Sequence, residues 1–269
     1  MESSTAIGQA GQVTAIDIRA VLIRWSALSI DVETNPADDN RIFKLGAVRS
    51  DRNDFLTLGR QPSDALVRQV DALTAGARVL VGHNLRRHDL PQLQRQFPKL
   101  ACLQLPLIDT LEWSAMAFPA NPYHRLVKGY KLLSDSRNDP LKDARITLDL
   151  LADEVQAFAA MHTDDPLWLS LLHFLVAHDA PLEQCLRTVR TASAPDARSA
   201  GATALSRFGS LCCSHRLAKV PAELAANPDH RFALALALGW IRVSGGNSVL
   251  PIWVHRSLPL VRQLIGELR

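Results

Sequence analysis

The chain has 269 residues, of which 47% are hydrophobic, and a formal net charge of +3. This length and composition predict a globular protein with one large or two modest domains and a well-filled core. The sequence has no run of about 18 apolar residues and no Cys-x-x-Cys spacing, which excludes a membrane-spanning helix and a zinc knuckle. Because the amino-terminal residues lack a basic region followed by an apolar run, we expect a cytoplasmic protein with no membrane partner.

The charge is unevenly distributed along the chain. Residues 1–165 contain 19 Lys and Arg against 21 Asp and Glu, a balance of −2, whereas residues 166–269 contain 11 against 6, a balance of +5. An acidic site beside a basic surface that follows a phosphate backbone would give this distribution, although a solvated surface of mixed charge is the commoner explanation. The charge distribution alone therefore selects no function.

The order of the predicted elements indicates an α/β fold. Runs rich in β-branched and apolar residues, bounded by turn residues, predict strands, and apolar residues at helical spacing predict helices. This order predicts helices packed on a mixed sheet. The expected elements are three strands over 21–34, 41–50 and 54–59, a helix over 62–77, a strand over 78–84, a helix starting near 89, a strand over 105–113 and a long helix over 140–161.

The chain is predicted to divide near residue 164. Residues 1–19 are expected to be a flexible lead-in, and residues 20–163 to form the α/β domain. The stretches after residue 164 have apolar residues at helical spacing and are separated by segments rich in Pro, Ala and polar residues. We therefore expect residues 164–269 to form a second, mostly helical domain.

Four carboxylates lie within or at the ends of these elements. Asp31 and Glu33 are two residues apart in the first predicted strand, so the period of two points both side chains to one face. Asp89 starts a helix directly after a buried strand, and Asp143 lies near the start of the long helix. Singly, each acid is better explained as a surface or capping residue. Together they predict a metal site, because carboxylates near a core are costly unless something neutralises them.

The order Asp31, Glu33, Asp89 and Asp143 resembles the DEDD superfamily of 3′–5′ exonucleases, whose fold is DnaQ-like and RNase H-like. The shared motifs are Asp-x-Glu, Asn followed by Asp, and a final Asp-Ala, and they cover about residues 20–160. The resemblance implies a five-stranded RNase H-like sheet and phosphodiester hydrolysis with two Mg²⁺ or Mn²⁺ ions. It assigns Asp31 to both ions, Glu33 and Asp143 to one of them, and Asp89 to the other.

One position departs from that resemblance. The family's third motif has a His or Tyr five residues before the last acid, and this chain has Asn138 there. An asparagine cannot act as a base at neutral pH, although its amide oxygen can position a water molecule. Three explanations stay open: the metals suffice, another residue such as His124 or His88 substitutes, or the activity is weakened.

A narrower resemblance concerns residues 121–144, Ile108-Asp109-Thr110 and residues 241–254. They are similar to exonuclease regions that precede the motor of bacterial RecQ-like helicases, in which Asn is common at the position of Asn138. The resemblance implies a helicase motor in a longer polypeptide and a role in DNA repair or defence. The chain itself has no Gly-x-x-x-x-Gly-Lys-Ser/Thr phosphate loop, so it contains no ATPase motor.

Residues around the acids are predicted to contact nucleic acid, because basic side chains neutralise phosphates and aromatic rings stack on bases. Solvated loops and a strand-end cap explain the same residues without a ligand. The expected activity is hydrolysis of DNA from single-stranded 3′ ends. The alternatives are a degenerate binding module that assists a helicase, or an RNA exonuclease. The predicted contacts are Thr34, His83, Asn84, Arg86, Arg87, Tyr123, His124, Lys128 and Lys131.

Overall fold

The computed structural model describes residues 25–52, 54–59, 64–124, 126, 139–227, 230–245 and 249–269. The lead-in predicted over residues 1–19 lies outside these residues, and so do three predicted site residues, Lys128, Lys131 and Asn138. Among the described helices, none combines the length and the apolar character that a membrane crossing requires.

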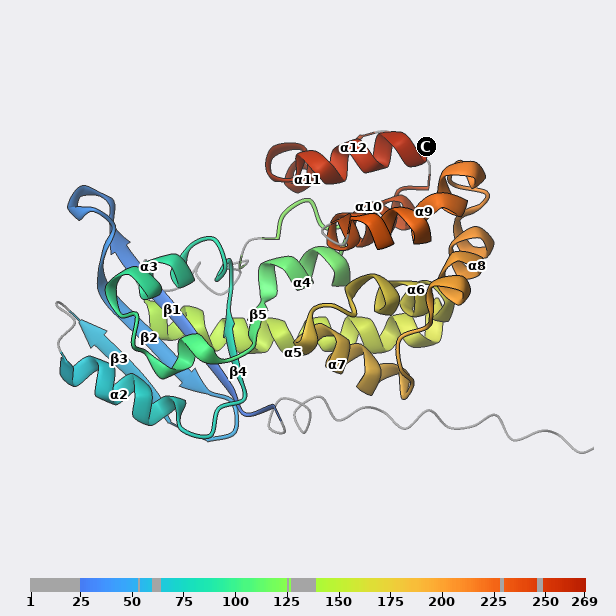
Figure 1. The fold of residues 1–269 in the computed structure, drawn as a ribbon. Coiled ribbons are helices and arrows are strands. Elements are labelled where there is room, and N and C mark those ends of the chain that lie inside the picture. The colour runs from blue at the N-terminus through green and yellow to red at the C-terminus, as the bar shows by residue number, and fades with distance from the viewer. Residues whose placement is uncertain are drawn as a thin grey trace, which may run out of the picture.

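A mixed sheet of five strands, in the order β3-β2-β1-β4-β5, forms the α/β part of the molecule (Figure 1). β1 pairs antiparallel with β2 and β2 with β3, while β4 is parallel to β1 and β5 to β4. The predicted meander of the first three strands is therefore confirmed, and so is the α/β fold class with its mixed five-stranded sheet. The strands are β1 (Ala27–Asn35), β2 (Arg41–Arg49), β3 (Phe55–Gly59), β4 (Val79–Gly82) and β5 (Leu107–Asp109).

Helices cover both faces of the sheet, and side chains alternate between the two faces along each strand. On one face, Leu28, Ile30 and Val32 of β1 pack in a core with α2 and α3. On the other, Ala27 of β1 and Val81 of β4 pack in a core with α4 and α5. Asp31 and Glu33 follow the period of Ala27, so they lie on the α5 face. The flanking helices are α2 (Asp64–Thr74), α3 (Asp89–Gln96), α4 (Thr110–Ala117) and α5 (Pro140–Asp164), and the short 3-10 helices are η1 (Pro36–Asp38) and η2 (Ala101–Gln104).

The strand predicted over 105–113 is wrong in its second half. β5 ends at Asp109 and α4 starts at Thr110. The cause is local capping: Asp109 has extended backbone angles, and its carboxylate accepts a hydrogen bond of 3.1 Å from the backbone N–H of Leu111. An aspartate in this position satisfies a helix N-terminus and ends the strand.

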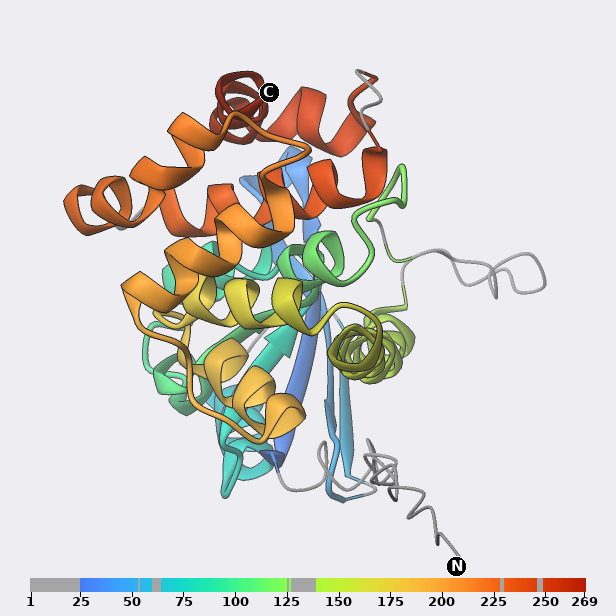
Figure 2. The ribbon, with the colours of Figure 1, turned by 90° about the vertical axis from the view of Figure 1, so that its right-hand side faces the viewer.

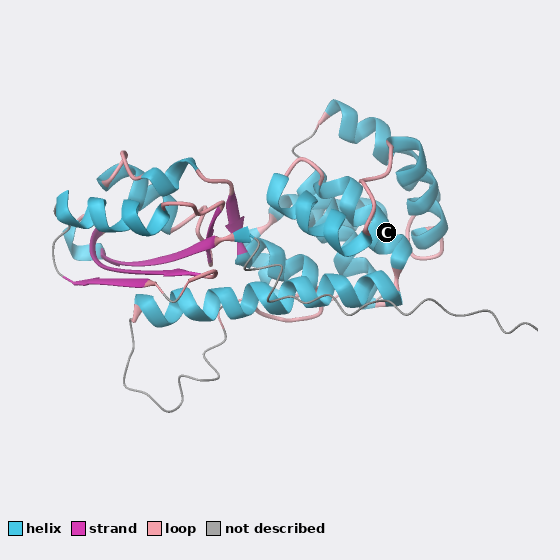
Figure 3. Cartoon of the chain, turned by 90° about the horizontal axis from the view of Figure 1, so that it is seen from below, coloured by secondary structure: helices cyan, strands magenta, loops and turns pink. Residues whose placement is uncertain are grey.

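The region after residue 164 is helical, as predicted, but its described residues do not form a core of their own. α5 runs from the sheet into the helical region, as Figures 1 and 3 show, and Figure 2 views it nearly end-on beside the strands. Buried residues of β4, β5, α4 and α5 form one hydrophobic cluster with those of the later helices. The predicted boundary thus coincides with the end of α5 but crosses a shared core. The later helices are α6 (Pro166–Val176), α7 (Ala180–Arg190), α8 (Ala197–Phe208), α9 (Ser214–Ala226), α10 (His230–Ser244), α11 (Ile252–Ser257) and α12 (Pro259–Leu268).

Candidate metal centre

Three of the four predicted acids meet on the α5 face of the sheet. Asp31, Glu33 and Asp143 each offer a carboxylate oxygen, and these oxygens all lie within 4.8 Å of one another. Asp31 and Glu33 are half-buried and Asp143 is buried. Carboxylates this close repel one another, so a cation between them stabilises the arrangement.

A glycine on β2 lets α5 approach this part of the sheet. Gly46 is the cross-strand partner of Asp31. A Cβ atom added at Gly46 would lie only 2.2 Å from the backbone nitrogen of Leu141, in the first turn of α5. Since glycine alone permits such a close backbone approach, Gly46 allows the start of α5, which carries Asp143, to lie against the strand next to Asp31.

The start of α5 is set by its own sequence. Asp139 caps the helix, accepting a hydrogen bond of 3.3 Å from the backbone N–H of Lys142, and Pro140 occupies the first turn. Proline suits this position because a backbone N–H group at the start of a helix has no partner within the helix, so its loss costs nothing. Asp143 therefore lies in the first turn, where the positive end of the helix dipole favours a carboxylate.

The cluster has the chemistry of a hard-cation site. It offers only carboxylate oxygens, which suit Mg²⁺, Mn²⁺ or Ca²⁺ rather than softer metals. Two oxygens on opposite sides of a Mg²⁺ ion are about 4.2 Å apart, twice its bond length of about 2.1 Å, and around Ca²⁺ about 4.8 Å apart. The spread of up to 4.8 Å thus fits one shared ion after a small adjustment, so the three acids could hold a metal ion.

Asp89 lies beside the cluster but outside the group of three. It is 2% exposed and starts α3. Burial raises the pKa of its carboxyl, while hydrogen bonds from His88 and from the backbone N–H of Val32 lower it. Val32 lies between Asp31 and Glu33, so this hydrogen bond places Asp89 next to the segment of β1 that carries both acids.

His88 is the histidine that the structure places at these acids. Its Nδ1 lies 2.9 Å from a carboxylate oxygen of Asp89, and its side chain is 52% exposed. The hydrogen bond with Asp89 raises the pKa of His88, and the charge of Glu33 raises it further. His124 differs: it is buried, its Nδ1 lies 2.9 Å from Ser114 Oγ, and burial lowers its pKa to about 4. Of the two suggested substitutes for Asn138, only His88 thus lies close to Asp89 and Glu33.

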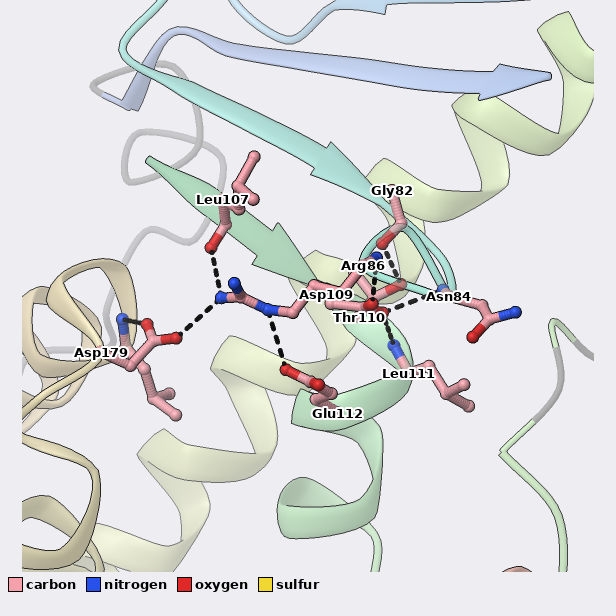
Figure 4. A network of polar contacts seen from close by, with 10 residues as sticks. Gly82, Asn84, Arg86, Leu107, Asp109, Thr110, Leu111, Glu112 and Asp179 are labelled. Carbon is pink, nitrogen blue, oxygen red and sulfur yellow. Dashed lines mark hydrogen bonds and ion pairs between the residues drawn. The ribbon is translucent and has the colours of Figure 1, made fainter. Parts of the chain in front are cut away.

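The loop between β4 and α3, residues 83–88, is held by a carboxylate that the sequence did not mark as a site residue. Asp109 is 2% exposed and accepts hydrogen bonds of 2.9 Å from the backbone N–H groups of Asn84 and Arg86, in addition to its cap of α4 (Figure 4). Asn84 has a left-handed φ of 63°, which asparagine tolerates better than most residues. Asp109 therefore fixes the loop that leads into Asp89.

His83 joins the same loop to its neighbours. The backbone N–H of Leu126 donates to His83 Nε2 at 3.1 Å, so Nδ1 carries the proton of a neutral ring and donates to Thr110 Oγ1 at 3.0 Å. Burial lowers the pKa of His83, against the charges of Asp109 and Asp143. These contacts agree with the alternative expectation that His83 caps the end of a strand.

Arg86 connects the loop to the helical region. Its Nε donates to Glu112 of α4 at 3.1 Å, and another guanidinium nitrogen donates to Asp179, the N-cap of α7, at 3.1 Å (Figure 4). The same nitrogen donates to the carbonyl of Leu107 at 3.4 Å. These ion pairs give Arg86 a structural role, and its predicted contact with a phosphate stays a prediction.

The other predicted contacts are spread around this centre. Thr34 is half-buried at an irregularity in the pairing of β1 with β2, directly after Glu33. Arg87 and Tyr123 are exposed, whereas His124 is buried and cannot stack on a base from an open surface. The prediction for Arg87 and Tyr123 as nucleic-acid contacts stays a prediction.

Two functional positions escaped the sequence reasoning, and each carried a signal. An isolated glycine within a strand, such as Gly46, indicates a close backbone approach. An aspartate at the end of an apolar strand, such as Asp109, is a candidate N-cap. Both signals identify a position but not the residue that it contacts, because that residue is distant in the chain.

The fold and the site together define an α/β protein with an acidic cluster, on one face of a mixed sheet, that could hold a metal ion. Comparison of the chain with protein-family models, with curated proteins and with solved structures found no match.

Proposed function

We propose that this protein is a metal-dependent 3′–5′ exonuclease of the DEDD type that acts on single-stranded DNA ends. One observation carries the proposal: Asp31, Glu33 and Asp143, from elements far apart in the chain, bring carboxylate oxygens within 4.8 Å of one another. Asp89 lies beside them on the neighbouring helix α3. The resemblance of the sequence to the DEDD superfamily supplies the reaction and its polarity.

In this proposal the acids hold two divalent ions, Mg²⁺ or Mn²⁺. When bound, two such ions supply an activated water and stabilise the charge that develops on phosphate and leaving oxygen. Asp31 would hold both ions, Glu33 and Asp143 would hold one of them, and Asp89 would hold the other. The helix N-termini at Asp89 and Asp143 stabilise the concentrated negative charge while no cation is present.

Hydrolysis also requires a group that accepts the proton of the attacking water. Asn138 cannot accept it at neutral pH. His88 lies at Asp89, which fixes its ring by the 2.9 Å hydrogen bond at Nδ1 and leaves Nε2 for another partner. We therefore assign His88 the role of proton acceptor.

The test is an end-labelled oligonucleotide assay with the metal varied. Single-stranded DNA labelled at its 5′ end should shorten stepwise from the 3′ end with Mg²⁺ or Mn²⁺ and stay intact in EDTA. Asp143→Asn should lower the rate at least about 10²-fold, the scale of losing a group that stabilises transition-state charge. Asp153→Asn is the matched control, since Asp153 is an exposed acid on the same helix α5.

Other outcomes of this assay select the alternatives. A protein that binds DNA but leaves it intact with both metals would be a binding module with a degenerate site. Faster degradation of RNA than of DNA of the same sequence would make it an RNA exonuclease. A helicase partner belongs to the proposal through the RecQ-like resemblance only.

A further inference from the structure

A cavity of about 290 Å³ lies between the loop that leads to Asp89 and the helical region. Asn84 and Arg87 of the loop border it on one side, and Phe232 of α10 and Trp253 of α11 on the other. A cavity of this volume has room for a planar heterocycle such as a nucleobase. Neither resemblance of the sequence assigns a role to this cavity.

Aromatic side chains form part of the cavity wall. His124 and Trp253 meet edge to face, with ring centroids 5.2 Å apart, and both line the cavity. His124 Nε2 and Trp253 Nε1 are buried and have no hydrogen-bond partner among the residues that the structure describes. The rings of Phe232 and Trp253 give this wall planar apolar surface, which suits a flat heterocycle.

The loop side of the cavity supplies charge and hydrogen-bonding groups. Arg87 is exposed and makes no ion pair or side-chain hydrogen bond with the described parts of the chain. The side-chain amide of Asn84 points away from the Asp109 network (Figure 4), and Asn84 also lines the cavity. An aromatic wall opposite an unpaired arginine suits a planar heterocycle that carries a phosphate.

We propose that this cavity binds a nucleotide, with its base against Phe232 and Trp253 and its phosphate at Arg87. The choice of a nucleotide over another planar anion rests on the proposed exonuclease function. The helical region thereby contributes part of the substrate-binding surface. The nucleotide is either one residue of the DNA strand or a free mononucleotide, and the experiment separates these two sources.

Binding can be measured without catalysis, in EDTA, on the full chain labelled with 5-fluorotryptophan. The chain has five tryptophans, and Trp253→Phe identifies the fluorine resonance of Trp253. Titration with 2′-deoxyadenosine 5′-monophosphate should shift that resonance saturably. The resonance of Trp25, which packs against Trp113 in the sheet core, should stay unchanged.

Two variants and one control test the assignment. Arg87→Ala should weaken mononucleotide binding about tenfold, the value of one charge-assisted hydrogen bond. Ala115→Phe should abolish it, because Ala115 lines the cavity and the larger ring fills it. Arg78→Ala is the matched control, since Arg78 is an exposed arginine just before the opposite end of β4. If Ala115→Phe does not fold, the comparison of Arg87→Ala with Arg78→Ala still decides.

Oligonucleotides with one abasic site, placed at successive positions from the 3′ end, identify the source. Weaker binding at one position supports a base of the strand, whereas equal binding at all positions together with mononucleotide binding supports a free nucleotide. If neither the mononucleotide nor the oligonucleotides shift the resonance of Trp253, the inference is overturned. Hydrolysis of DNA with Mn²⁺ in that case leaves the exonuclease proposal standing, and mononucleotide binding without hydrolysis leaves the nucleotide site standing.

Discussion

Among the histidines that the structure describes, His88 has surroundings that suit a proton acceptor, because it combines an exposed ring with a hydrogen bond to Asp89, the buried acid beside the cluster. We predict that His88→Ala lowers kcat about 10²-fold or more, the usual contribution of a general base, with little change in KM. His162→Ala should be neutral, because His162 lies 19 residues beyond Asp143 on α5, about 28 Å along the helix. Steady-state kinetics with Mn²⁺ measure both. Wild-type kcat in His88→Ala would refute the assignment.

Glu154 is a carboxyl group placed where no charge is tolerated. It is fully buried on α5, and neither carboxylate oxygen has a hydrogen-bond partner among the described residues. Burial raises its pKa well above the ordinary value, and the charges of Asp109 and Asp153 raise it further. The group is therefore protonated in the folded protein well above the pH at which it ionises in the unfolded chain.

The sign of its pH dependence follows from that raised pKa. Glu154 destabilises the fold least below the ordinary pKa of about 4.3, and the free energy of unfolding falls as the pH rises toward the folded pKa. We predict that Glu154→Leu raises the free energy of unfolding by about 1–3 kcal/mol at pH 8 and by less at pH 4. Urea unfolding at both pH values measures this difference. The same gain at pH 4 and pH 8 would contradict it, and Asp164→Asn, at an exposed acid near the end of the same helix, serves as the control.

For single residues, the sequence predicted which side chains form the site better than it predicted their contacts. Asp31 and Glu33 were predictable because strand alternation alone puts them on one face. The role of Arg86 was not, since its partners Glu112 and Asp179 belong to helices whose positions no local pattern specifies. His124 was expected near the substrate as a surface residue, and its burial depends on packing against Trp253 of a distant helix.

Among the secondary-structure elements, the contact between β2 and α5 determines the geometry of the centre. We predict that Gly46→Ala destabilises the fold by about 1–3 kcal/mol, because the added methyl group forces α5 from the sheet, and that it also weakens Mn²⁺ binding. Gly266→Ala is the matched control: it lies in α12 with nothing within 4 Å of an added Cβ, so it should stabilise the helix by up to about 1 kcal/mol. Thermal unfolding and a Mn²⁺ titration measure the two effects. Unchanged Mn²⁺ affinity in Gly46→Ala would contradict this account.

Most secondary-structure elements of the α/β part were predictable from the sequence, and β5 is the exception. α5 was predicted because its apolar residues recur at helical spacing over many turns. The strand β5 was predicted too long, because residues 110–113, Thr-Leu-Glu-Trp, alternate polar and apolar side chains as a strand does. The helix prevails there because Asp109 caps it and Trp113 is buried in the core shared with α5.

For the molecule as a whole, the shared core predicts that the α/β part depends on the helical region. A chain ending at Asp164 would expose buried side chains of α4 and α5, among them Trp113 and Phe158. It would also lose the partner of Arg86 in α7, Asp179. We predict that residues 1–164 alone do not unfold cooperatively, whereas the full chain does. Circular dichroism melting and size-exclusion chromatography measure this, and a monomeric fragment with a cooperative transition would contradict it.

The arrangement of the two parts could not be predicted from the sequence. Apolar residues at helical spacing after residue 164 indicated a second, mostly helical domain, and the region is helical. Whether such helices form a core of their own or extend an existing one depends on which apolar faces meet, and the spacing of apolar residues is the same in both cases.

Titration of the protein with Mn²⁺, followed by electron paramagnetic resonance, tests the central claim most directly, because it reports on the acids without any assumption about substrate. We predict saturable Mn²⁺ binding by the wild type and by Asp153→Asn, and its loss in Asp31→Asn and Asp143→Asn with the fold intact. At 100 times the dissociation constant, Mn²⁺ should also raise the free energy of unfolding of the wild type by about 2.7 kcal/mol. Equal binding by all four proteins, or binding by none, would contradict the assignment of Asp31, Glu33 and Asp143 as metal ligands.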